Sequence, residues 1–253
     1  MKKKDLYSLI LHPDYRFLET FVRSIPERFE NEGETIYTGR NLIKVFDVEG
    51  LKINVKRYKV PIYINRLVYT FLRKSKAYRA YYYADRLKQL GVDTPAPIAS
   101  LCFNKRGLLH RCFFISVQLE HANTLYEGYK LPEDKRKALF TDLGRYTAQL
   151  HEKGIYHKDY SPGNILYDAK NHFYLVDINR MQFDASISLK KGCKNFARLW
   201  GKANEILPPI AEGYARERGF DYEKCLRSME KEHEFFWKSY ERKKKHPAPF
   251  ISQ

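Results

Sequence analysis

Three short segments near the start of the chain have a composition typical of strands, and hydrophobic and polar residues alternate along the second and the third. The segments are Thr35–Thr38, Leu42–Phe46 and Leu51–Tyr58, and Glu49-Gly50 separates the last two. Strict alternation is typical of a strand that buries one face, and a Glu-Gly pair suits the turn between two strands. The pattern therefore predicts a three-stranded antiparallel meander.

A long basic, tyrosine-rich segment follows the meander. It predicts a helix over about Arg66–Leu90, which ends at Gly91 with two prolines shortly beyond. Ile98–Phe103 and Cys112–Leu119 predict a further pair of strands. We interpret Glu120–Asn123 as the hinge to a second lobe.

Helical spacing returns in the second half of the chain, on both sides of a predicted hairpin. Apolar residues recur every three or four positions between Leu131 and Gly154, and this predicts a helix that Gly154 terminates. Ile165–Tyr167 and Phe173–Val176 predict a hairpin, and Lys190–Lys245 is predicted to be mainly helical.

Composition narrows the class of protein. No apolar run approaches the roughly 20 residues of a membrane-spanning helix, and the basic N-terminus lacks the apolar core of a signal peptide. The four cysteines are scattered without metal-ligand spacing. We therefore expect a soluble cytoplasmic protein with reduced thiols.

The chain is strongly basic. Its 46 Lys and Arg outnumber 30 Asp and Glu, which leaves a net charge of +16. Such a surplus attracts nucleic acid, an anionic membrane or phosphorylated substrates. Because the chain has no Arg-rich repeat, zinc-finger spacing or RNP-like aromatic motif, we expect no nucleic-acid partner.

The segment from His157 to Leu166 carries the most specific chemical signal. Asp159 follows His157 by two positions, Asn164 follows Asp159 by five, and Asp177 ends the next predicted strand. In a kinase catalytic loop, such an Asp accepts the proton of the attacking hydroxyl, while the Asn and the second Asp hold Mg²⁺. The alternative without a catalytic role is that Asp159 caps a helix and Asn164 lies in a turn. We predict Asp159 as the base, Asn164 and Asp177 as metal ligands, and His157 as a structural hydrogen-bonding residue.

The predicted meander contains candidates for nucleotide binding. Lys56 lies on the face opposite Val55 and is the candidate phosphate-binding lysine, with Gly39 and Arg40 as a short phosphate-cradling turn and Glu120 at the hinge. Such a lysine usually pairs with a Glu on the following helix, but no Glu occurs between Val60 and Val92. Two alternatives remain: Lys56 pairs elsewhere, for instance with Asp177, or phosphates alone hold it.

The loop also favours a small acceptor over a peptide. Serine/threonine protein kinases commonly carry Lys two residues after the catalytic Asp, but this chain carries Ser161. No Ala-Pro-Glu follows to anchor a peptide-docking segment. We therefore predict a phosphotransferase with a small-molecule alcohol as acceptor.

With these residues in view, the chain resembles the lipopolysaccharide core kinases, the Kdo/heptose kinase family of bacterial envelopes. The similar parts are Val55–Tyr58, Ser75–Ala77 leading to Leu90–Pro95, His157–Leu166 and Val176–Arg180. The resemblance implies an α+β, bilobal protein-kinase-like fold. Residues 1–120 would form a small N-terminal lobe with an antiparallel sheet and one helix that binds nucleotide. Residues 121–253 would form a larger, mainly helical lobe with the catalytic loop, metal site and acceptor site.

The resemblance also implies a reaction and its partners. ATP and Mg²⁺ would phosphorylate a hydroxyl of the Kdo or heptose attached to lipid A, at the inner face of the cytoplasmic membrane. Phe235–Lys245 combines aromatic residues with cations; it suits either an anionic membrane interface or a terminal helix that packs on the larger lobe. Two alternatives stay open: a kinase-like enzyme for another small molecule or a protein, and a pseudokinase that only binds.

Overall fold

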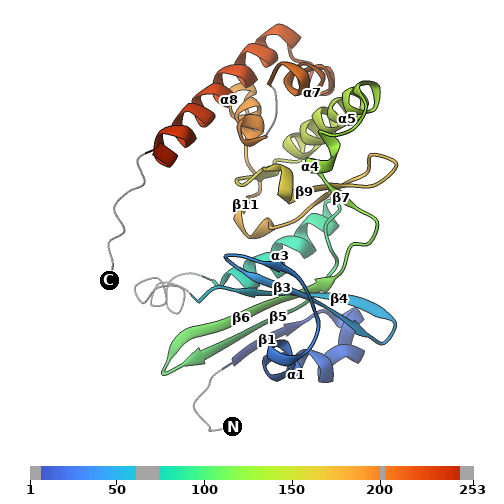
Figure 1. Cartoon of the computed structure of the whole chain (residues 1–253), viewed down its shortest axis with the longest axis vertical. Helices are drawn as coiled ribbons and strands as arrows, with labels where there is room; N and C mark the ends of the chain where they lie inside the picture. The colour runs from blue at the N-terminus through green and yellow to red at the C-terminus, as the bar shows by residue number, and fades with distance from the viewer. Residues whose placement is uncertain (1–6, 61–73, 200–202, 246–253) are drawn as a thin grey trace. The chain divides into compact units, whose positions relative to one another are not determined.

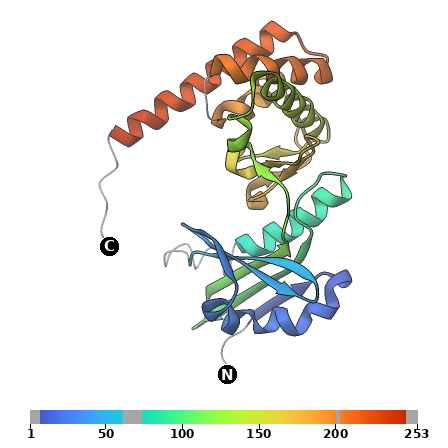
Figure 2. The same cartoon turned by 45° about the vertical axis from the view of Figure 1, so that its right-hand side comes forward.

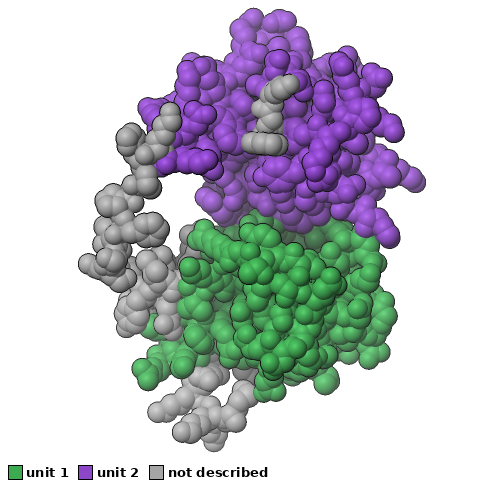
Figure 3. All heavy atoms as spheres, in the orientation of Figure 1, with its two compact units in different colours: residues 1–120, 177–179 green, residues 121–176, 180–253 purple. Residues whose placement is uncertain are grey.

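The computed structural model describes residues 7–60, 74–199 and 203–245. The chain forms two compact units, one of residues 1–120 with 177–179 and one of residues 121–176 with 180–253 (Figure 3). The sequence analysis assigned residues 177–179 to the second lobe. They belong instead to the first unit, where Asp177 contacts Lys56.

The first unit is built on a six-stranded antiparallel sheet (Figure 1). The strand order across it is β1-β5-β6-β4-β3-β2. The strands are β1 (Tyr7–Leu11), β2 (Glu34–Thr38), β3 (Leu42–Val48), β4 (Leu51–Tyr58), β5 (Pro97–Lys105) and β6 (Leu108–Val117). The predicted meander and the second strand pair are confirmed, whereas β1 was not predicted.

Two tight turns set the register of this sheet. Glu49 and Gly50 connect β3 to β4 with φ of 51° and 75°, and Arg106 and Gly107 connect β5 to β6 with φ of 54° and 76°. Two consecutive residues with positive φ give a turn whose twist matches that of the flanking strands. These turns bring residues from alternate positions onto a common face.

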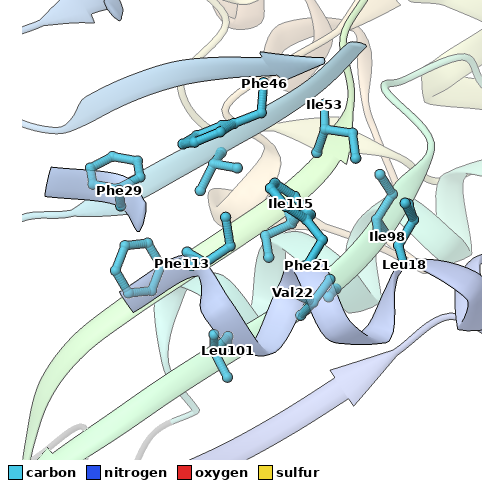
Figure 4. Close-up of a cluster of buried hydrophobic side chains, with 13 residues drawn as sticks. Leu18, Phe21, Val22, Phe29, Phe46, Ile53, Ile98, Leu101, Phe113 and Ile115 are labelled. Carbon is cyan, nitrogen blue, oxygen red and sulfur yellow. The ribbon is translucent and has the colours of Figure 1, made fainter. Parts of the chain in front are cut away.

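Helix α1 (Glu19–Asn31) covers one face of the sheet. It follows the short 3₁₀ helix η1 (Pro13–Leu18) and was not predicted, because the sequence analysis expected a single helix in this lobe. Its apolar stripe meets strand residues in one buried cluster (Figure 4): Leu18, Phe21, Val22, Ile25, Phe29, Phe46, Ile53, Val55, Ile98, Ala99, Leu101, Phe113 and Ile115. This stripe supplies the apolar contacts that hold α1 on the sheet.

Helix α3 (Lys76–Gln89) covers the opposite face of the sheet (Figure 2). Its N-cap is Ser75, whose Oγ accepts a hydrogen bond from the Tyr78 N–H at 3.0 Å. The predicted start at Arg66 is wrong, since Lys74 and Ser75 are not helical; the part of that prediction on residues 66–73 lies outside the described residues. The predicted stop is confirmed, with Gly91 at a φ of 64°.

A disulfide joins the strands beneath α3. Cys102 on β5 lies directly opposite Cys112 on β6, with 4.1 Å between their Cα atoms, and the two side chains are bonded. The expectation of reduced thiols is therefore wrong for this pair, because tertiary pairing brings together two residues whose spacing alone shows no motif. Cys193 and Cys225 are free thiols and are buried.

The second unit is mainly helical. Its longer helices are α5 (Glu133–Glu152), α7 (Ala203–Arg218) and α8 (Tyr222–Lys245), and its shorter ones are α4 (Leu125–Gly128), α6 (Leu189–Asn195) and the 3₁₀ turn η5 (Phe196–Arg198). Helices α5 and α7 approach closely at Gly144 and Gly213, where a Cβ atom would overlap the backbone of the other helix. The predicted helix up to Gly154 is confirmed, and so is the mainly helical character of Lys190–Lys245 over its described residues.

Short strands in this unit position the catalytic loop. The predicted hairpin is confirmed as β9 (Ile165–Tyr167) and β10 (Phe173–Leu175), with β7 (Asn123–Thr124) beside β9. A second small ladder pairs β8 (Tyr156–His157) with β11 (Met181–Gln182). Among the described helices, none combines the length and apolar character that crossing a bilayer requires.

Candidate active site

The predicted catalytic loop lies between β8 and β9. It ends in the 3₁₀ turn η3 (Pro162–Asn164), and the Asn164 Nδ2 donates a hydrogen bond to the Asp159 carbonyl at 2.8 Å. The Val176 N–H donates to the Asn164 carbonyl at 3.0 Å. These bonds tie the loop to the hairpin that leads into Asp177. Asp159 and Asn164 are thereby held in one rigid segment.

His157 holds this loop in place through hydrogen bonds of its imidazole ring. Its Nε2 donates to the Val176 carbonyl at 3.1 Å, and its Nδ1 accepts from the Asp159 N–H at 3.1 Å. Both ring nitrogens are engaged by backbone groups, and the side chain is buried. The prediction that His157 is structural is confirmed, because neither ring nitrogen is left to take a proton from a substrate.

A chain of hydrogen bonds between buried polar groups supports His157. Asn195 Nδ2 donates to the His157 carbonyl at 2.9 Å, and Asn195 Oδ1 accepts from His151 Nε2 at 3.0 Å. The His151 Nδ1 in turn lies 2.8 Å from the Tyr214 hydroxyl. Burial lowers the pKa of His151 to about 4, so this imidazole is neutral near pH 7. The sequence analysis did not identify this chain of hydrogen bonds.

Two arginines surround the carboxylate of Asp159. Arg198 Nη1 donates to Oδ1, and Arg180 Nη1 lies 3.7 Å from Oδ2. The Asp159 side chain is 25% exposed, so both cations act on a partly desolvated carboxylate. That Asp159 takes a proton from an acceptor hydroxyl stays a prediction. Arg180 belonged to a segment noted in the sequence, whereas no motif indicated Arg198.

In the first unit, Lys56 and Asp177 form an ion pair. Lys56 Nζ lies 2.7 Å from Asp177 Oδ1, which also accepts a hydrogen bond from Asn179 Nδ2 at 2.7 Å. Asp177 has a φ of 51°, in the left-handed region, at the start of the 3₁₀ turn η4 (Ile178–Arg180). Of the two alternatives for Lys56, the structure shows the pairing with Asp177.

Cations on α3 occupy the region where a glutamate was expected. The Arg79 guanidinium donates to the Asn179 carbonyl at 2.9 Å and so helps to hold the segment that carries Asp177. Burial lowers the pKa of Lys76, and the nearby Arg40 guanidinium lowers it further. Arg40, Lys56, Lys76 and Arg79 therefore form a cationic cluster around Asp177. Lys76 and Arg79 lay in a basic segment whose role the sequence analysis did not identify.

The remaining nucleotide-binding candidates lie at the ends of strands. Gly39 and Arg40 form the turn between β2 and β3, where the Gly39 N–H donates to the Asn41 carbonyl at 3.1 Å. Glu120 ends the first unit and pairs with Lys52, with 2.6 Å between Oε1 and Nζ. The structure brings Lys56 and Asp177 together in one unit, and Asp159 and Asn164 in the other. Convergence of the two groups around one nucleotide stays a prediction.

The donor types of Asn164 and Asp177 fit Mg²⁺, which prefers oxygen ligands. The Asn164 amide donates through Nδ2, and its Oδ1 accepts no hydrogen bond from the described residues. Lys56 and Asn179 both contact Asp177 through Oδ1. Within the described ranges, no three His, Cys, Asp or Glu side chains cluster as a metal site. That Asn164 and Asp177 bind one magnesium ion stays a prediction.

Curated relatives match parts of the chain. A 3-deoxy-D-manno-octulosonic acid kinase of Xanthomonas campestris pv. campestris (strain B100) is 33% identical over 89 residues, which are 35% of this chain and 34% of the relative. The enzyme of the same description from Xanthomonas oryzae pv. oryzae (strain PXO99A) is 25% identical over 142 residues, 56% of this chain and 53% of the relative. The chain thus spans between one third and about half of the length of these relatives.

A solved structure and a family model match most of the chain. The structure, WaaP in complex with acyl carrier protein, has a TM-score of 0.61 and 16% identity, and the match covers 93% of this chain and 98% of that one. This similarity confirms the predicted α+β, protein-kinase-like fold class. The model of the Lipopolysaccharide kinase (Kdo/WaaP) family matches residues 22–213, a range that contains the catalytic loop, Lys56 and Asp177. The chain therefore belongs to the lipopolysaccharide kinase (Kdo/WaaP) family.

Proposed function

We propose that this protein transfers the γ-phosphoryl group of ATP to a hydroxyl of the acidic sugar 3-deoxy-D-manno-octulosonic acid (Kdo) in a lipid A-linked core. Heptose is the second candidate acceptor. Family membership and the relatives named as Kdo kinases support a sugar acceptor. The observation that carries the proposal is the rigid loop that holds Asp159 and Asn164 next to the hairpin leading to Asp177.

Asp159 acts as the general base. Its carboxylate, which contacts Arg198 and Arg180, orients the acceptor hydroxyl and takes its proton. The sugar oxygen forms a bond to the γ-phosphorus, the bond from that phosphorus to the bridging oxygen breaks, and ADP leaves. Positioning and electrostatic stabilisation supply most of the rate in this type of transfer.

The first unit binds the nucleotide. Lys56, Gly39 and Arg40 contact its phosphates, and Glu120 lies at the hinge beside it. Asn164 and Asp177 would hold Mg²⁺, which would supply positive charge that stabilises the negative charge of the transferring phosphate. The cations Lys76 and Arg79 add positive potential near Asp177, and this potential favours a triphosphate.

The enzyme works at the inner face of the cytoplasmic membrane as a peripheral protein. A net charge of +16 attracts it to anionic lipid, to which basic residues near the surface contribute about 1 kcal/mol each. Helix α8 carries exposed aromatic side chains, with Phe235 at 65% and Tyr240 at 52%, among lysines. These features suit contact with a lipid-linked acceptor.

Product analysis tests the proposed function. The purified protein is incubated with ATP, Mg²⁺ and Kdo-lipid A, and mass spectrometry should detect one added phosphate on the sugar. Asp159→Asn should abolish transfer and leave thermal unfolding within a few degrees of the wild type, while the exposed control Asp134→Asn remains active. Transfer by Asp159→Asn at the wild-type rate contradicts the assigned base. Assays with labelled ATP and other acceptors identify a different substrate. If ATP is not hydrolysed with any acceptor, the protein is a pseudokinase.

A further inference from the structure

A groove of about 320 Å³ lies in the second unit, beside the catalytic loop. Its walls come from Tyr156–Tyr160, from Lys194–Arg198 and from one face of α8 between Glu232 and Lys243. Lys158 and Tyr160, which flank Asp159 in the chain, both line it. Its volume falls within the range of about 300–1,000 Å³ that is usual for small-ligand sites.

The groove carries a surplus of positive charge. Lys158, Lys194, Arg198 and Lys243 line it, with Glu232 as the one carboxylate among its described lining residues. Glu232 lies 3.7 Å from Lys194. Neither Lys158 nor Lys243 forms an ion pair with any residue that the structure describes. Lysines that balance no acid and share a concave surface attract an anion.

Aromatic side chains of α8 also line the groove. Phe236 and Tyr240 on α8 stack with 6.5 Å between ring centroids and 17° between ring planes. Phe235 and Tyr240 remain among the most exposed large side chains of the described residues. A groove lined by both aromatic rings and cations suits a ligand with one apolar face and one anionic group.

Arg198 connects the groove with the base. Its guanidinium donates to Asp159 Oδ1, and its Cζ lies 5.4 Å from the centroid of the Phe236 ring. An arginine presents several donors in one plane, so Arg198 can bind a second carboxylate while it stays near the first. An anion held on Arg198 therefore places the rest of its molecule close to Asp159.

We propose that this groove is the acceptor site and that it recognises the sugar through its carboxylate. Lys158 and Arg198 bind the carboxylate, Lys194 and Lys243 extend the positive surface, and Phe236 and Tyr240 take the face of the sugar ring. The inference rests on the proposed function and adds what selects the acceptor: a sugar acid is preferred to a neutral sugar. Contact of Arg198 with that carboxylate brings the reacting hydroxyl to Asp159.

Steady-state kinetics provides the first test. Lys158→Gln and Lys243→Gln remove charge without leaving a buried acid unpaired, and Lys238→Gln is the matched control, since Lys238 pairs with Glu234 on α8 and does not line the groove. Each groove variant should raise the KM for the acceptor about 10-fold, the effect of one lost charged contact. The KM for ATP should stay within about twofold of the wild-type value, and so should the rate of ATP hydrolysis without acceptor. The lost contact is made with the acceptor, so it should not change the affinity for ATP. Unchanged acceptor KM in both groove variants overturns the proposal.

Direct binding separates this inference from the proposed function. Saturation-transfer NMR with the free sugar acid, its methyl ester and inorganic phosphate reports binding without turnover. The acid should bind the wild type, and the ester and phosphate should bind about 10-fold more weakly or not at all. Lys158→Gln should weaken binding of the acid, and Lys238→Gln should not. If the wild type binds the acid in this way but transfers no phosphate, the proposed function fails and the groove assignment stands. Equal binding of acid and ester, or of acid and phosphate, overturns recognition of a sugar carboxylate.

Discussion

Lys56 Nζ lies 2.7 Å from Asp177 Oδ1, although 121 residues separate them in the chain. The lysine side chain is 13% exposed and the aspartate 31%. A mostly buried ammonium needs a carboxylate nearby, and α3 carries cations where a glutamate was expected. Asp177 is therefore the partner of Lys56 as well as the proposed metal ligand.

Removal of the Lys56 charge should impair transfer more than folding. We expect Lys56→Met to lower kcat/KM for ATP about 10²–10³-fold, as loss of a group that stabilises transferring charge usually does. Lys59→Met, three residues along and exposed, is the control. Steady-state kinetics and thermal unfolding check both variants. A Lys56→Met enzyme with wild-type ATP kinetics contradicts the role of this lysine.

Replacement of Asp177 should alter the metal requirement. In Asp177→Asn the neutral amide is a weaker ligand for Mg²⁺ and a weaker partner for Lys56. We expect the Mg²⁺ concentration for half-maximal activity to rise at least about 10-fold, since a lost charge-assisted contact is worth about 1.5–3 kcal/mol. Titration of activity with Mg²⁺ at saturating ATP measures this shift. The exposed strand variant Asp47→Asn should keep the wild-type requirement.

We expect the side-chain amide of Asn195 to hold the catalytic loop in position and not to bind the substrate. Asn195→Ala removes one hydrogen bond from the His157 carbonyl and one from His151 Nε2 in a buried site, which costs about 1–3 kcal/mol of unfolding free energy. Chemical denaturation measures that loss. We also expect a lower kcat with little change in the KM for ATP, because the loop that carries Asp159 loses support. Asn204→Ala, on the exposed side of α7, is the control.

Stability should fall at mildly acidic pH because of His151. Its pKa is about 4 in the folded protein and 6.5 in the unfolded chain, so between these values the unfolded chain binds a proton that the folded one does not. The free energy of unfolding therefore rises with pH through this window and declines as pH falls from 6.5 towards 4. The decline attributable to His151 is at most about 3 kcal/mol.

Denaturant titrations at several pH values check this dependence. His151→Gln should flatten the slope between pH 6.5 and 4, since glutamine does not titrate, even though the variant is less stable throughout. His172→Gln, an exposed histidine in the β9–β10 turn, should keep the wild-type slope. If the free energy of unfolding depends on pH equally in the wild type and in His151→Gln, His151 is not the cause of the dependence.

Elements with local signals were predicted well. The meander strands alternate along their length, and Gly154 adopts a φ of 68° at the end of α5, as a helix-terminating glycine does. Strand β1 and helix α1 were missed because a short apolar run does not distinguish strand from helix by its period. The start of α3 was placed too early, because Ser75 interrupts a segment whose composition suits a helix on both sides.

The sequence by itself determined the catalytic loop. The spacing of His157, Asp159 and Asn164 is a local property, since a tight turn between two short strands places these side chains by their order alone. The same holds for the hairpin that ends at Asp177, and for the absence of a glutamate that would pair with Lys56 from the next helix.

Only the tertiary structure decided which distant residues meet. The contacts of Lys56 with Asp177, of Arg198 with Asp159 and of Asn195 with His157 join residues 38 or more positions apart. No periodicity encodes such pairs, because each depends on how whole helices and strands pack and on which buried charges must be balanced. The disulfide between Cys102 and Cys112 follows the same rule, since strand register sets the two residues opposite each other.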